Sequence, residues 1–187
     1  FGAFARAVEG PGVGSLLTIY SVATSREGIS LAGGYPAGEL MPVEAFVIAL
    51  LDKEQQEIEG VYLVDGEERS PNQRIPLGRG LSGQVIASGE PLLVHGEEEA
   101  TTLGGITYGE LGTPLSIVAV PMTLGNETIG MLSAQSYQPN VYSQDDLQVL
   151  GTLANQATVA IQNGRLFAET QRLAEELEQR VIERTRA

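Results

Sequence analysis

Two pairs of apolar segments along the chain predict β-hairpins. Residues 45–51 form a continuous apolar run, and residues 59–64 form a second run after a polar turn. Residues 116–123 and 128–135 form the second pair around the turn Gly125-Asn126-Glu127. Between the hairpins, the pattern favours a short helix at 81–87 and a strand at 92–94. We therefore expect antiparallel strands at the centre of the fold.

The C-terminal quarter of the chain predicts one long helix. Ser143 is a suitable N-cap, Asp145 and Asp146 lie in the first turn, and no proline follows. At ~1.5 Å per residue the helix is ~60 Å long. Its first half has a broad apolar face that suits packing on a domain, whereas its second half keeps a narrow stripe. We expect this stripe to be the seam of a homodimer, formed by Leu166, Leu173, Leu177 and Val181.

The remaining segments have weaker patterns. We expect residues 1–42 to hold a tail, a short helix within 15–24 and a loop at 28–42 that is rich in glycine and proline. Residues 95–114 combine an acidic run with several glycines, which predicts a long surface loop that serves as a lid. The expected domain occupies 43–168, and residues 169–187 form a coiled-coil linker helix.

Composition and charge narrow the function classes. Eleven basic and 24 acidic residues give a net charge of −13, and without a basic patch we expect no nucleic-acid binding and no direct membrane contact. The absence of cysteine excludes disulfides, thiolate metal sites and cysteine nucleophiles. No apolar run approaches the roughly 18 residues of a membrane span. We expect a cytoplasmic domain, whose parent protein can still be membrane-anchored.

Four groups have both a functional and a structural interpretation. Gly78–Gly83 spells G-x-G-x-x-G, which suits either a nucleotide cradle or a structural turn; the short helix that follows favours the turn. His95, the only histidine, is either a loop residue without a role or a ligand or haem contact. Residues 97–99, three glutamates, suit calcium or simple solvation. Ser82 and Ser133 lack a plausible base, so we expect no catalytic residue and no metal site.

Several phrases of the sequence resemble the GAF domain family. Residues 75–94, IPLGRGLSGQVIASGEPLLV, are similar to its most recognisable segment. Residues 119–122 with 129–136 resemble its central hairpin, and residues 142–150 resemble the entry to its last helix. The resemblance covers 43–168 and implies an α+β, PAS-related fold. This fold has an antiparallel sheet of five to six strands, helices on one face, a cavity on the other and a long C-terminal helix.

The resemblance also implies a function. Such a domain is a sensory and dimerisation module of a bacterial signalling protein, and residues 172–187 resemble the linkers that lead into histidine kinases. It binds an unidentified small molecule, with unknown cofactors, and transmits through its last helix. The implied pocket would be approached by Phe46, Ile48, Tyr62, Leu81, Val85, His95, Tyr108, Ala119, Met131, Ser133 and Gln135.

Two other functions stay open, and some family activities are disfavoured. The domain could be a structural dimerisation spacer with no ligand, or a small enzyme that uses the same pocket. The stretch 142–146 lacks the lysine and glutamate of the family's nucleotide-binding signature. The cysteines of bilin-binding and sulfoxide-reductase-type members are also missing.

Overall fold

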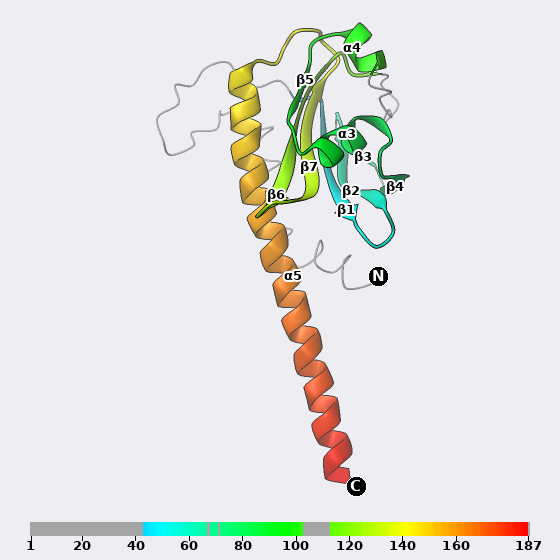
Figure 1. Ribbon diagram of the computed structural model, residues 1–187, viewed down its shortest axis with the longest axis vertical. Helices are drawn as coiled ribbons and strands as arrows, with labels where there is room; N and C mark the ends of the chain where they lie inside the picture. The colour runs from blue at the N-terminus through cyan, green and yellow to red at the C-terminus, as the bar shows by residue number, and fades with distance from the viewer. Residues whose placement is uncertain (1–42, 67, 71, 103–112, 187) are drawn as a thin grey trace.

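The computed structural model describes residues 43–66, 68–70, 72–102 and 113–186. An antiparallel sheet lies at its centre, with the strand order β3-β2-β1-β7-β6-β5, and a further strand, β4, also pairs with β2 (Figure 1). The strands are β1 (Ala45–Asp52), β2 (Glu57–Asp65), β3 (Glu68–Ser70), β4 (Gln73–Pro76), β5 (Leu92–Val94), β6 (Ser116–Leu124) and β7 (Glu127–Ser136). The helices are α3 (Gly80–Ser88), α4 (Glu97–Thr102) and α5 (Gln144–Arg186).

The two predicted hairpins are confirmed as β1–β2 and β6–β7. In the second hairpin Gly125 takes a positive φ of 63°, the left-handed conformation that glycine adopts readily at a tight turn. β1 also pairs with β7, so the two hairpins join along their first and last strands. The α+β class with a central antiparallel sheet and a long C-terminal helix is therefore confirmed.

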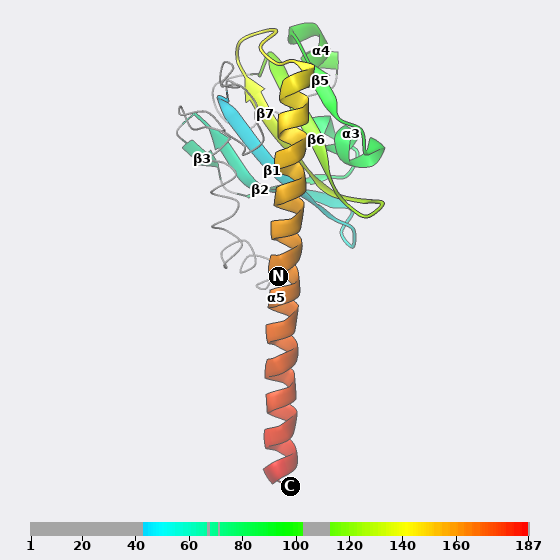
Figure 2. The same ribbon diagram turned by 90° about the vertical axis from the view of Figure 1, so that its left-hand side faces the viewer.

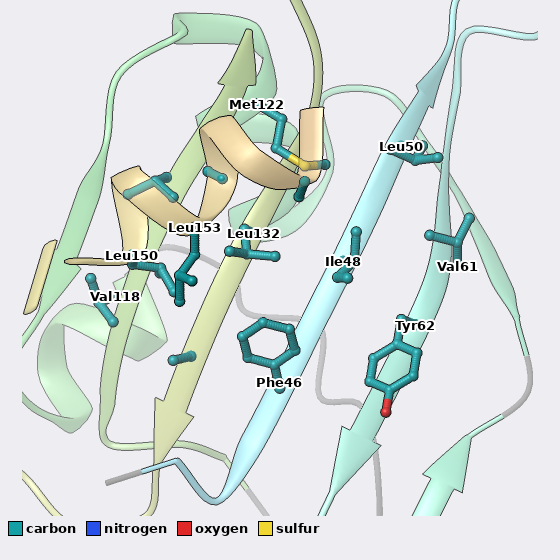
Figure 3. Close-up of a cluster of buried hydrophobic side chains, with 14 of the residues drawn as sticks. Phe46, Ile48, Leu50, Val61, Tyr62, Val118, Met122, Leu132, Leu150 and Leu153 are labelled. Carbon is teal, nitrogen blue, oxygen red and sulfur yellow. The ribbon is translucent and has the colours of Figure 1, made fainter. Parts of the chain in front are cut away.

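Alternation along the strands creates two separate cores, one on each face of the sheet. Phe46 pairs with Val64, and both belong to the core under α5. Val47 pairs with Leu63, and both belong to the core under α3 and α4. Figure 3 shows the first core, where Leu150 and Leu153 of α5 lie over Leu132 of β7. We refer below to the α5 face and the α3 face of the sheet.

Helix α5 begins on the sheet and continues well beyond it (Figures 1 and 2). Its 43 residues span ~64 Å at ~1.5 Å per residue. Asp146 caps the start of the helix through its side chain: the Ser143 N–H and Oγ–H both donate to Asp146 Oδ2, at 2.8 and 2.7 Å. The long helix and its start, expected from the sequence, are confirmed.

One local expectation is corrected. The segment predicted as a long loop, 95–114, contains the short helix α4 in its first part. Its three glutamates lie in the first turn, where negative charge favours the helix dipole, and Glu99 Oε2 accepts from the His95 N–H at 2.8 Å. The predicted helix at 15–24, the loop at 28–42 and Tyr108 lie outside the described residues.

Candidate functional site

The α3 face of the sheet offers a floor of small and polar side chains. Ala49, Ala119 and Ser133 are fully buried on the central strands β1, β6 and β7. Gln135 Nε2 donates to Ser133 Oγ at 3.2 Å. Small and polar side chains on central strands suit the floor of a ligand site, so this face is the candidate.

The glycine-rich turn before α3 is built for packing. Gly78 has a φ of 89°, which favours glycine. A Cβ added at Gly83 would lie 2.8 Å from the carbonyl carbon of Gly78, so the first turn of α3 rests directly on the backbone of the turn. The backbone conformation at Gly78 and the close packing at Gly83 thus explain why these two positions of the G-x-G-x-x-G pattern are glycine. The geometry supports the structural interpretation of this motif.

Helix α3 closes part of the α3 face. Its Leu81, Val85 and Ile86 are buried and pack with Val47, Met131 and other apolar residues of the sheet. Figure 1 shows α3 and α4 on the side of the sheet opposite α5. A ligand on this face would therefore lie between the sheet and these short helices.

A polar cluster that the sequence did not reveal lies at one end of this face. Asp65 ends β2 and is only 7% exposed, and its Oδ1 accepts a 2.8 Å hydrogen bond from Tyr137 Oη. Burial and the hydrogen bond to Asp65 raise the pKa of Tyr137, so its hydroxyl stays protonated and remains a donor at neutral pH. Glu44 Oε2 accepts from the backbone N–H of Tyr137 and from Ser136 Oγ. An aspartate at the end of a buried strand is the only sequence signal for this cluster.

The segment between β7 and α5 is fixed by backbone donors. The Asn140 N–H donates to the His95 carbonyl at 2.9 Å, and the Val141 N–H donates to Ser116 Oγ at 3.3 Å. Tyr142 follows and is 3% exposed; burial raises its pKa, and Glu44 and Asp146 add to the effect. This connector, residues 137–143, therefore contacts His95 just after β5, Ser116 of β6 and the start of α5.

The pocket candidates from the sequence divide between the two faces. Phe46, Ile48 and Tyr62 belong to the core of the α5 face, as Figure 3 shows. On the α3 face the structure brings together Leu81, Val85, Ala119, Met131, Ser133 and Gln135. His95 is half-buried at the end of β5, beside α4. Since a sheet separates the two groups, they do not line one cavity.

The predicted seam residues lie exposed on the free half of α5. Leu166, Leu173, Leu177 and Val181 are 51, 46, 61 and 64% exposed. Val159, 59% exposed, extends the stripe towards the sheet at the seven-residue spacing of Leu166 and Leu173. The sequence interpretation missed Val159, although its heptad spacing was readable.

Two features of the described residues bear on alternative functions. Within the ranges the structure describes, no three histidine, aspartate or glutamate side chains are grouped so as to hold a metal ion. The helices described contain no stretch long and apolar enough to cross a membrane.

Comparison with known proteins agrees with this architecture. Residues 37–162 match the family described as GAF domain. This match spans more than half of the chain, and the chain belongs to the GAF domain family. No curated protein matches it.

Solved structures share the fold at low sequence identity. The GAF domain of a two-component sensor histidine kinase from Bacillus halodurans has a TM-score of 0.52 at 20% identity, over 67% of this chain and 86% of that one. The second GAF domain of DevS from Mycobacterium smegmatis has a TM-score of 0.52 at 17% identity, over 84% of this chain and 98% of that one. Free methionine-R-sulfoxide reductase from Neisseria meningitidis has a TM-score of 0.52 at 23% identity, over 79% of this chain and 80% of that one. Identities below 25% establish the fold alone.

Proposed function

We propose that this chain is a sensory and dimerisation module of a signalling protein. A small molecule binds on the α3 face, and α5 passes the resulting change to whatever follows it. The observation that carries this proposal is the construction of α5. Its first half packs on the sheet through Leu150, Leu153 and Ala157, and the second half leaves the domain with an exposed apolar stripe.

An exposed stripe with heptad spacing favours a second copy of the same helix. The positions at 159, 166 and 173 repeat every seven residues, and Leu177 follows four residues after Leu173. Two such helices bury their stripes by packing side by side as a coiled coil. In a parallel pair, a small rotation or shift of one helix against the other is a signal that later segments can read.

The remaining parts of the proposal rest on resemblance. Residues 172–187 resemble linkers of histidine kinases, and the Bacillus halodurans domain comes from such a kinase. We therefore propose a histidine kinase as the parent protein and the cytoplasm as the location of the domain. The module itself is proposed to have no catalytic activity: the chain has no cysteine and one histidine.

A second candidate function has its own support. Ala119, Met131 and Ser133 are no more than 1% exposed, so these candidate ligand contacts are already covered by the protein's own atoms. A domain whose α3 face is filled in this way would be a structural spacer that only holds two chains together.

Native mass spectrometry of the purified protein separates the candidates. A dimer that releases a bound small molecule under denaturing conditions supports the sensor and gives the ligand's mass. A dimer without a bound molecule, also after incubation with cell extract, supports the spacer. A monomer at micromolar concentration contradicts the proposed role of α5.

A further inference from the structure

The carboxylate of Asp65 has one oxygen that the fold does not use. Alternation along β2 places Asp65 on the same face as Leu63, which packs in the core under α3. Tyr137 Oη donates to Oδ1. Oδ2 is buried and has no hydrogen-bond partner among the described residues. Leaving a buried charged acceptor unpaired is costly, so this oxygen calls for an explanation.

Carboxylates at the other end of the sheet are neutralised within the chain. Arg74 forms ion pairs with Glu59 at 2.8 Å and with Glu57 at 3.2 Å, and Lys53 pairs with Glu127 at 2.6 Å. Among the described residues, no lysine, arginine or histidine forms an ion pair with Asp65. Glu59, Glu57 and Glu127 thus each have a cation beside them, whereas among the described residues the buried carboxylate of Asp65 has none.

The groups around Asp65 indicate that a hydrogen-bond donor would complete the site. Glu44, whose carboxylate accepts from Tyr137 N and Ser136 Oγ, brings a second acid to the same connector. The Tyr137 hydroxyl already donates its hydrogen bond to Asp65 Oδ1. The described donors here are already bonded to Glu44 and to Asp65 Oδ1 and none of them reaches Oδ2, so a positively charged donor would complete the site.

We propose that Asp65 Oδ2 binds a positively charged N–H group, an ammonium or a guanidinium, of a small molecule on the α3 face. This inference rests on the proposed sensor function and names the chemical class of its ligand. The bond is a charge-assisted hydrogen bond to a buried carboxylate, among the strongest that a small site can offer.

The same carboxylate connects the ligand to the output helix. Tyr137 is the first residue of the connector 137–143, which contacts His95 and Ser116 and ends at the cap of α5. A cation bound at Oδ2 withdraws electron density from the same carboxylate that Tyr137 Oη contacts through Oδ1. Occupancy of Asp65 thus acts directly on the segment that positions the start of α5.

A titration with simple cations tests the proposal on the whole chain. The probe is methylguanidinium chloride, followed by 1H–15N correlation spectra at constant ionic strength. Tetramethylammonium chloride, which has the charge but no N–H, is the matched control. The expected result is a saturable shift of the Gly66 and Tyr137 amide signals with methylguanidinium alone. Shifts that do not saturate, or equal shifts with both cations, overturn the proposal.

Variants show whether Asp65 is responsible. Asp65→Asn keeps the shape and an acceptor for Tyr137, and it is expected to raise the half-saturation concentration at least about tenfold. Glu90→Gln, which removes an exposed carboxylate, is expected to leave the concentration unchanged. In the ligand-free protein, Asp65→Asn is expected to keep the melting temperature or raise it, because a ligand-binding carboxylate costs stability when empty.

Failure of this inference is distinct from failure of the sensor proposal. A saturable response on the α3 face that Asp65→Asn leaves unchanged overturns the role of Asp65 while the sensor stands. A large loss of stability in ligand-free Asp65→Asn also overturns it, since Asp65 is then a structural residue. The oligomeric state of the same samples, measured separately, reports on α5 and not on Asp65.

Discussion

Replacing Leu173 and Leu177 together by lysine is expected to separate the dimer and leave the sheet folded. In one chain these side chains are 46% and 61% exposed, and neither belongs to the core of the α5 face. Their removal therefore costs the domain little. Paired helices would bury the exposed parts of both side chains in each chain.

The size of the effect follows from that burial. Full burial of a leucine is worth about 2 kcal/mol, so burying the exposed half contributes about 1 kcal/mol. Four leucines in the two chains then contribute about 4 kcal/mol, which corresponds to about a thousandfold change in the dimer Kd. The added lysines repel one another across the seam and increase the loss.

Sedimentation velocity over a range of concentrations measures this change, and circular dichroism checks the fold. The control is Glu175→Lys with Gln179→Lys, which adds lysines to the other side of α5 and is expected to leave the dimer intact. A dimer of unchanged Kd in the leucine variant would refute the assignment of the seam. An equal loss in the control would show that charge, and not the stripe, is responsible.

Three further predictions concern stability, measured by urea unfolding. Gly130→Ala is expected to lose about 2–3 kcal/mol of unfolding free energy, because the added Cβ would collide with the Ala49 carbonyl oxygen. Gly151→Ala, where nothing lies within 4 Å of the added Cβ, is expected to gain about 0.5–1 kcal/mol. The opposite order of stabilities would contradict the packing of β7 on β1. Asp146→Ala is expected to lose about 1 kcal/mol through the cap of α5, and an unchanged midpoint would contradict that cap. The pKa of Tyr137 is raised in the fold, so its contribution is complete below the unfolded tyrosine pKa of about 10 and is lost as pH rises further. Tyr137→Phe should therefore flatten the alkaline decline of stability, and an unchanged decline would refute this linkage.

The sequence predicted those parts of the fold that depend on local patterns. Both hairpins follow from apolar runs that end at polar or glycine-containing turns. The start of α5 follows from Ser143 and Asp146, which are three residues apart and contact each other in the structure. Such features need only neighbouring residues to be recognised.

The division of the pocket candidates between two faces was not predictable in this way. Phe46 and Val47 are adjacent in the chain, and both are buried in an apolar run. Which of them faces α5 depends on the register of β1 against β2 and β7, a tertiary property. Because the run is buried on both faces of the sheet, its residue types do not indicate which side chains face α5.

The cluster at Asp65 arises from pairing across a long stretch of chain. Asp65 and Tyr137 are 72 residues apart, and they meet because β1 lies between β2 and β7. Helix α4 was missed for a different reason. An acidic run suits a solvated loop as well as a first helical turn; in the structure the bond from the Ala100 N–H to the Gly96 carbonyl and the Glu99 contact to the His95 N–H distinguish them.

Disulfide trapping of single-cysteine variants tests the pairing of α5 most directly. The chain has no cysteine, so one introduced residue reports without background. Leu173→Cys lies on the stripe and Gln179→Cys lies on the other side of the helix. We expect a covalent dimer after mild oxidation for Leu173→Cys and far less for Gln179→Cys. Equal trapping of both variants, or none at Leu173→Cys, would contradict the proposal that this domain signals through a parallel pair of C-terminal helices.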